Sequence, residues 1–489
     1  MRRPIVFLAL AAAATAAALP AQAVGPNYQR PQVALTPAFR NAPPAGQGAS
    51  VVGAAGLTAW WDSFGDPGLT RVVERALAQN LDLAQARARI LQGRARVKVA
   101  TARLLPSGQT SASVGETEQS LLSPIGAIGS HVPGFERTYD LYDVGVAASW
   151  EIDLFGGLRR SREAARADAA AAIAQAEAVR ISVAAEAADA YLQVRAFQAR
   201  LDVARRQART QQDLVDLLTQ RTRQGVAAER DLHQAQAALD GVQATIPPLL
   251  AGLEVQANRL DVLMGAQPGT WRAELDMAAP IPAAPSLSVA EGPADLLRRR
   301  PDVIAAEQRL VAANARIGEA VAEYYPKVSI SGLLGFESLD SSRLLASNAL
   351  QRQIGAGLRW RLFDFGRVDG EVAAARGADA EALAAYRAAI LRAAEDVENA
   401  FSDLAQQEAR AAALERQVGE LTAARRQAEL AYEGGVASLI EVRDTDRDLL
   451  AASDQLAQAR AAAARAAVAA YRALGGGWRP ESLAKVTQR

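Results

Sequence analysis

The sequence predicts a mixed α+β chain in which long helical hairpins and pairs of β-strands occur in two copies of one unit. Three observations support this fold class: long stretches rich in Ala, Arg, Glu, Gln and Leu, short segments in which apolar and polar residues alternate, and a motif at 149–156 that recurs at 359–366. Aromatic residues make up 5% of the 489 residues, and this composition favours extended helices over a set of compact domains.

The N-terminus has the pattern of a secretory signal peptide. Two arginines precede an apolar run at 5–19, and an Ala-Gln-Ala triplet ends at Ala23. We expect cleavage after Ala23, so that the exported chain begins at Val24. A membrane anchor helix is the alternative, but the run is short and rich in Ala. Because the sequence has no cysteine, neither disulfides nor a lipid-modified N-terminal Cys can form.

Charge and residue content exclude several classes of function. The chain has 54 basic and 54 acidic residues, and this balance gives no basic surface for nucleic acid. No later segment offers about twenty uninterrupted apolar residues, so membrane-spanning helices are not expected. The two histidines, His131 and His233, lie near no HExxH, GxSxG, phosphate-loop or dinucleotide motif. We therefore predict no enzyme activity, no cofactor and no metal site.

A tandem duplication organises the chain. Trp150, in SWEIDLFG, matches Trp360, in RWRLFDFG, at an offset of 210, whereas Pro106 matches Pro326 at an offset of 220. The first copy is therefore longer by about ten residues, the difference between 220 and 210. We place this insertion in a Gly- and Pro-rich loop at 121–136. The predicted segments are a signal peptide (1–23), an N-terminal periplasmic segment (24–65), repeat unit 1 (66–270), a Pro-rich linker (271–293), repeat unit 2 (294–478) and a C-terminal tail (479–489).

Each unit opens with a helix. In unit 1 it begins at Asp66, an N-cap acid followed by a proline, has a break near Asn80 and ends before Pro106. In unit 2 the corresponding helix follows Pro301 and ends before Pro326.

Two strands then follow in each unit. Alternation of period two marks them near 110–114 and at 142–152, and again at 328–332 and 354–362. An apolar face with an aromatic residue near its end is typical of a transmembrane barrel strand, although a soluble hairpin with one wet face has the same pattern. Four strands are too few to close a barrel, whereas three chains would supply about twelve.

Long helices complete each unit. A continuous helix over 157–224 would extend roughly 100 Å at 1.5 Å per residue, and a second begins after Gly366. Apolar stripes of coiled-coil spacing occur at Leu214, Leu217, Leu218, Leu414, Val418 and Leu421. Each helix breaks once, at Gly225 or at Gly434 and Gly435, and a returning helix follows. We therefore predict two antiparallel helical hairpins with glycine turns at their tips.

Several segments carry a family resemblance. They are VGPNYQRP at 24–31, the Trp-Trp pair at 60–61, and above all LLRRRPDV at 296–303, followed by AANARIG at 312–318. These segments resemble the outer membrane efflux protein (TolC-like) family, specifically the NodT-type outer membrane factors of resistance-nodulation-division (RND) tripartite systems. In this branch a lipidated Cys often precedes the Val-Gly-Pro segment. Ala23 stands there instead, so we expect an unlipidated protein in the outer membrane with a large periplasmic portion.

The resemblance implies a fold, partners and a function. Three chains would form one 12-stranded β-barrel in outer-membrane lipid and a periplasmic α-barrel tunnel. The tunnel would dock a periplasmic adaptor protein and, through it, an inner-membrane RND-type pump, and the duct would conduct exported small molecules. A type I protein-secretion duct has the same fold and remains an alternative. A periplasmic coiled-coil scaffold is a second alternative, but an adaptor-like scaffold would have one helical hairpin rather than two.

The resemblance also implies a gate at the hairpin tips. By position, Tyr432 and its acid partner Asp231 would close the tunnel, and Glu441 and Asp444 would form acidic rings that favour cations. Ala437 occupies the place of the gate's Arg. The alternative is that these are solvated tip side chains.

Other conspicuous residues have structural readings. We interpret Gly225, Gly434 and Gly435 as tip turns rather than contacts. Trp150 and Trp360 are interpreted as membrane-interface aromatics, with core packing as the alternative. The arginines at 298–300 resemble an anion site but fit better as partners of local acids near a helix end.

Overall fold

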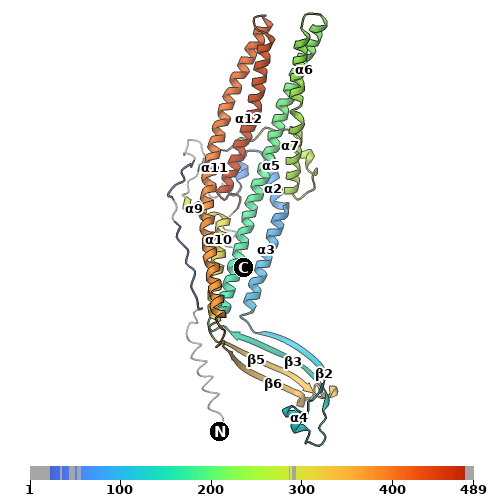
Figure 1. Cartoon of the computed structure of the whole chain (residues 1–489), viewed down its shortest axis with the longest axis vertical. Helices are drawn as coiled ribbons and strands as arrows, with labels where there is room; N and C mark the ends of the chain where they lie inside the picture. Colours follow the sequence, from blue (N-terminus) through green and yellow to red (C-terminus); the bar gives the residue numbers. More distant parts are fainter. Residues whose placement is uncertain are drawn as a thin grey trace. The chain divides into compact units, whose positions relative to one another are not determined.

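A computed structural model describes residues 23–33, 36–42, 50–51, 57–285, 287–288 and 293–478 (Figure 1). Most of the predicted signal peptide and the predicted tail, 479–489, lie outside these residues. The chain forms two compact units. Of these residues, the strand unit comprises those within 23–31, 91–171 and 307–385, and the helix unit comprises those within 32–90, 172–306 and 386–478.

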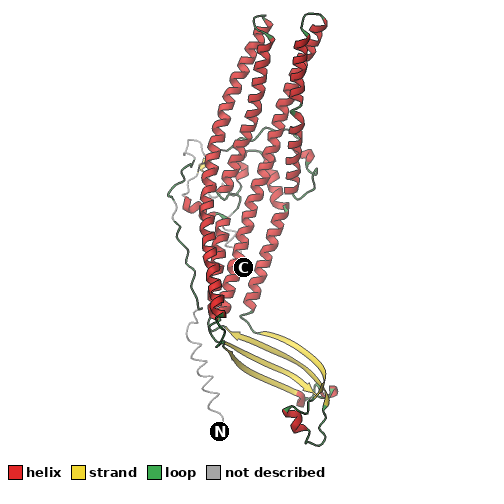
Figure 2. Cartoon of the chain, viewed as in Figure 1, coloured by secondary structure: helices red, strands yellow, loops and turns green. Residues whose placement is uncertain are grey.

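One antiparallel sheet dominates the strand unit (Figure 2). Its strands, in spatial order, are β2 (Ser107–Glu118), β3 (Thr138–Ile152), β5 (Lys327–Ser338) and β6 (Leu350–Arg359). The two repeats meet at the β3–β5 pair, where Val146 lies opposite Leu334. β2 and β6 are therefore the open edges of the sheet.

The sheet has one apolar and one polar face because successive side chains of a strand point to opposite sides. Val146, Leu334 and Ile354 share the apolar face and are exposed, Ile354 to 88%. Gln109 and Gln353 belong to the polar face. Exposed apolar surface of this extent marks a face that another apolar medium or another protein covers.

Three details of this unit differ from the sequence prediction. β6 ends at Arg359, so Trp360 and Leu362 lie beyond the strand. The weakly patterned first strand is a full strand of 12 residues, because pairing along β3 supports it despite its Ser and Gly content. The loop at 121–136 contains a short helix, α4 (Pro124–Gly129), which starts because the Ser123 hydroxyl accepts a hydrogen bond from the Gly126 amide.

Helix bounds confirm the duplication. α3 (Leu81–Ala102) and α10 (Pro301–Ala322) match at the offset of 220 that relates Pro106 to Pro326. α5 (Gly157–Arg223) and α11 (Arg367–Glu433), of 67 residues each, match at the smaller offset of 210. α2 (Pro67–Gln79) starts as predicted, because the Asp66 carboxylate accepts hydrogen bonds from two backbone amides of its first turn.

The N-terminal segment of the strand unit is held by side chains of α5 and α10. The buried Arg160 guanidinium donates to the Val24 carbonyl at 3.2 Å and to Asn27 Oδ1 at 2.7 Å. Arg30 forms a two-pronged ion pair with Glu307, at 2.6 and 2.7 Å. The N-terminal segment that carries part of the family resemblance is therefore anchored on the helices of both repeats.

Two helical hairpins lie in the helix unit. α5 returns as α6 (Glu229–Gln243), followed by α7 (Ile246–Leu263), and α11 returns as α12 (Leu439–Ala473). Gly225 and Gly435 have φ of 74° and 72°, so the left-handed backbone that glycine favours makes each turn. Gly434 has no positive φ and is an ordinary turn neighbour.

Apolar stripes hold each hairpin together. Leu218 and Val215 pack with Leu239 of α6, and Leu414 packs with Leu456 of α12. Leu217 is exposed, contrary to its assignment to the stripe, because the packing seam runs through its neighbours.

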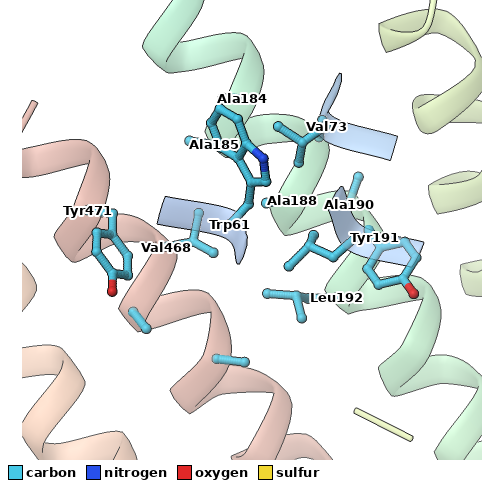
Figure 3. Packing of buried hydrophobic residues seen from close by; sticks show 14 of the residues in the cluster. Trp61, Val73, Ala184, Ala185, Ala188, Ala190, Tyr191, Leu192, Val468 and Tyr471 are labelled. Carbon is cyan, nitrogen blue, oxygen red and sulfur yellow. The ribbon is translucent and has the colours of Figure 1, made fainter. Parts of the chain in front are cut away.

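The hydrophobic core is built from residues of both hairpins, of α2 and of the short 3-10 helix η1 (Trp60–Phe64). Figure 3 shows part of it, with Trp61, Tyr191 and Tyr471 among the labelled side chains. Trp60 and Tyr471 stack with ring centroids 5.3 Å apart, and both are buried. Many of the surrounding core residues of α5 and α12 are alanines, whose small side chains let helices approach closely.

Short elements complete the described chain: β1 (Ser50–Val51), which pairs in parallel with β4 (Leu287–Ser288), the helices α8 (Arg272–Leu275) and α9 (Pro293–Arg299), and the 3-10 helices η2 (Ser341–Arg343) and η3 (Ser347–Ala349). Among the described helices, none combines the length and the apolar character needed to cross a membrane.

Candidate functional site

The tips of the two hairpins are joined by a side-chain hydrogen bond. Arg221, in the last turn of α5, donates from Nη1 to the Tyr432 hydroxyl in the last turn of α11, at 2.9 Å. Asp231, the predicted partner of Tyr432, instead accepts from the adjacent Arg230 at 3.2 Å. The predicted Tyr432–Asp231 pairing is therefore absent from the described tips, because the arginine at the end of α5 reaches the tyrosine and Asp231 is engaged within α6.

Two further contacts join the hairpin tips. Leu439, at the start of α12, packs against the Leu218 and Leu239 cluster of the other hairpin. Arg443 donates to the Gln234 carbonyl at 3.4 Å. Exposed polar contacts of this kind stabilise by about 1 kcal/mol or less each, so the tips are weakly coupled.

Below the tips, stronger pairs join the same two hairpins. Arg200 of α5 forms a two-pronged pair with Asp454 of α12, at 2.6 and 3.2 Å, and Arg465 pairs with Asp189 at 2.5 Å. Both partners of these pairs are charged, whereas the hydrogen bonds described between the tips have a neutral acceptor. The contrast identifies the tips as the part of the hairpins that separates most readily.

The two predicted ring acids have different environments. The Glu441 side chain completes a capping box with Ser438 and so helps to start α12. Asp444 is exposed and lies 3.7 Å from Arg447. Sequence reasoning missed Asp446, which is buried and accepts from Arg425 of α11 at 2.9 Å. Its position two residues after Asp444 places it on the opposite side of the helix, facing α11.

A buried arginine fixes the region that carries the most specific part of the resemblance. Arg300 binds Asp302 and Asp396 at 2.7 and 2.9 Å, and it also donates to the carbonyls of Ala393 and Ala473. Burial alone would lower the pKa of Arg300, but the two carboxylates raise it above its usual value. The guanidinium therefore stays charged and is engaged by this chain's own groups, which supports local pairing over an anion site.

The two predicted interface tryptophans make the same contact twice. Trp150 Nε1 donates to the Leu104 carbonyl and Trp360 Nε1 to the Tyr324 carbonyl, each at 3.0 Å. Both carbonyls lie just after a helix, where backbone acceptors lack helical partners. Each indole N–H is therefore used within the chain, while both rings remain exposed. Their place in a membrane interface stays a prediction.

The described residues hold no group of three or more His, Cys, Asp or Glu side chains arranged to bind a metal ion. The features that distinguish the molecule are an exposed apolar sheet face and paired helical tips.

The sequence profile of outer membrane efflux proteins matches two segments of the chain, 72–266 and 292–476. The chain belongs to the outer membrane efflux protein family. The two matched segments start 220 residues apart and end 210 residues apart, which are the two offsets of the duplication.

Relatives of this family match almost the whole chain. The pyoverdine export outer membrane protein OpmQ of Pseudomonas putida is 32% identical over 454 residues, which cover 91% of this chain and 94% of OpmQ. Nodulation protein T of Rhizobium leguminosarum bv. trifolii is 27% identical and covers 94% of this chain and 96% of its own length. The solved outer-membrane channel OprN is 34% identical, with a TM-score of 0.83 over 94% of this chain and all of OprN. The chain is an outer-membrane efflux channel with the TolC-like fold.

Proposed function

We propose that three copies of this chain form the exit duct of a tripartite efflux system. The duct would conduct small molecules delivered by an RND-type inner-membrane pump through a periplasmic adaptor. The observation that carries this proposal is the sheet of four strands with two open edges and an exposed apolar face. A sheet of this size cannot close on itself, whereas three copies supply about twelve strands for a barrel.

The faces of the sheet assign an orientation to the barrel. Val146, Leu334 and Ile354 would face outer-membrane lipid, and the polar face would line the channel. Trp150 and Trp360 would sit at the periplasmic interface of the membrane, because each lies at the helical end of its strand. Removal of a signal peptide at Ala23 and the absence of a lipid anchor belong to the same proposal.

The hairpin tips would serve as adaptor dock and gate. Val226 and Val436, which occupy equivalent positions of the two repeats, are 74% and 88% exposed. Apolar side chains this exposed at paired tips suit a protein partner. The Arg221–Tyr432 contact would hold the tips together, and Asp444 would add negative charge near the channel axis.

Small-molecule efflux is favoured over protein secretion by the relatives. OpmQ is named for export of pyoverdine, and its alignment spans nearly the full length of both chains. We propose a transport role without catalysis, since the tip and sheet features described above all suit a conduit.

Heat-modifiable gel migration and chemical crosslinking in isolated outer membranes test this function. The expected result is a detergent-resistant trimer that dissociates only on boiling. Purified trimer in a planar bilayer should also conduct ions. A monomer in the periplasmic fraction would overturn the proposal and favour the scaffold alternative.

A further inference from the structure

Equivalent strands of the two repeats have different neighbours within one chain. β3 of the first repeat pairs with β5 of the second, whereas their counterparts, β6 and β2, form the open edges. If several copies of the chain close into a ring, first and second repeats alternate around it. We then expect the strand pair between two copies to resemble the strand pair between the two repeats of one chain. The contacts of the β3–β5 pair therefore serve as a template for the two open edges.

We propose that β6 of one copy pairs antiparallel with β2 of a second copy, in the register that places Ala356 opposite Val114. The template pair is Val146 and Leu334. The repeat offset of 210 relates Val146 to Ala356, and the repeat offset of 220 relates Leu334 to Val114. The inference rests on the proposed assembly of several copies, and it adds a residue-level interface to that assembly.

A pair of glycines supports this register. At the template, Gly145 lies opposite Gly335, and a Cβ on Gly335 would lie 2.6 Å from the Val144 carbonyl oxygen. The register places Gly355 opposite Gly115 of the second copy. Within a single chain nothing described lies within 4 Å of a Cβ built on Gly115. The second copy would supply the close backbone approach that explains this glycine.

Charge complementarity supports the same register. It places Arg352 of β6 opposite Glu118 at the end of β2. Within the chain, Glu118 pairs with Arg137 at 3.1 Å, so the carboxylate would lie between two guanidinium groups. Opposite charges directly across a strand pair are stabilising. A register shifted by one residue would also turn the apolar face of β6 away from the apolar face of β2.

A loop beside each strand end provides independent support. Phe155 stacks on Tyr325 with ring centroids 4.5 Å apart. Their counterparts, Phe365 and Leu105, are exposed, and Phe365 has a φ of 54°, a left-handed conformation that a bulky residue rarely adopts. The proposed interface brings Phe365 over Leu105 of the second copy, which covers both side chains.

The interface also accounts for the premature end of β6. The alternating pattern extends to Leu362, but the strand ends at Arg359 in the single chain. In the proposed register Leu362 lies opposite Gly108, inside β2 of the second copy. Pairing would therefore extend β6 over the whole patterned segment.

Cysteine crosslinking tests the register, since the natural chain has no cysteine. Gln353 and Thr117 are opposite in this register, so the double variant Gln353→Cys with Thr117→Cys should form disulfide-linked trimers in outer membranes under mild oxidation. The matched control, Gln353→Cys with Ser113→Cys, is displaced by four residues, or about 13 Å along the strand, and should not crosslink.

The outcomes separate this inference from the proposed function. A protein that remains trimeric by gel migration but crosslinks only in the control would overturn the register and leave the trimer intact. A protein that is monomeric by both measures would overturn the trimer itself.

A second measurement tests the loop. Phe365→Ala should lower the temperature at which the trimer dissociates in detergent, whereas Phe363→Ala, which removes another exposed aromatic side chain of the same loop, should leave it nearly unchanged. Equal effects of both substitutions would contradict the contact between Phe365 and Leu105.

Discussion

The hydroxyl of Tyr432 accepts a hydrogen bond from the Arg221 guanidinium at 2.9 Å, and this contact links two hairpins that belong to different repeats of the chain. Because this hydrogen bond is open to solvent, the contact contributes about 1 kcal/mol at most. A bond of this strength can hold the tips together and still yield to a partner.

Arg221→Ala is therefore expected to loosen the tips. If they close the duct, the single-channel conductance in planar bilayers should rise several-fold, and Tyr432→Phe should have the same effect. Arg230→Ala is the control, since Arg230 bonds its neighbour Asp231 on the same helix. Unchanged conductance in both Arg221→Ala and Tyr432→Phe would show that this contact does not gate the channel.

The two ring acids should be separable by substitution. Asp444→Asn should reduce cation preference, measured as a smaller reversal potential in a salt gradient, because it removes three charges from the trimer. Glu441→Gln removes a charge but keeps a side chain that can complete the capping box. Glu441→Ala should in addition lower stability by about 1 kcal/mol through loss of that cap. Asp240→Asn, at the far end of α6, is the control, and an equal loss of selectivity there would argue against a localised acidic ring.

The second tip turn offers a matched pair of glycines. Gly435→Ala should cost about 1 kcal/mol in the free energy of unfolding of the hairpin, because φ is 72° and a Cβ is strained there. Gly434→Ala should cost less, since its φ is not positive. Hydrogen exchange at the tip measures the difference. Equal protection in the two variants would contradict the assigned turn geometry.

Tyr191 predicts an alkaline limit to stability. Burial, offset in part by Arg195, raises the pKa of this tyrosine to about 12. The neutral hydroxyl is therefore favoured in the fold, and its contribution is complete below pH 10 and is lost as the pH rises from about 10 to about 12. The loss amounts to about 2 to 3 kcal/mol. Tyr191→Phe should flatten this part of the stability profile, and an unchanged profile would assign the alkaline transition to other groups.

The sequence predicted the repeats well because duplication leaves a signal that does not depend on tertiary contacts. The offsets of Trp150 and Pro106 from their counterparts reappear as helix and strand bounds. The break near Asn80 was also predictable, since an Asn side chain can cap the next helix. The tip glycines were predictable because few other residues make such turns.

Contacts between distant side chains were not predictable in the same way. The partner of Tyr432 depends on which way side chains at two separate helix ends point, and sequence spacing does not define this direction. α4 escaped prediction because its glycines suggested a loop, although Ser123 and Pro124 carry the signals of a helix start. The end of β6 depends on an edge partner that a single chain does not contain.

The open edges have a consequence for the order of assembly. Two chains joined edge to edge would still expose one β2 and one β6, as a single chain does, so only closure of the ring satisfies the last row of backbone donors and acceptors. Dimers would gain little protection over monomers from unwanted strand pairing. Ring formation should therefore be cooperative, and newly exported chains should need shielding until the third copy arrives.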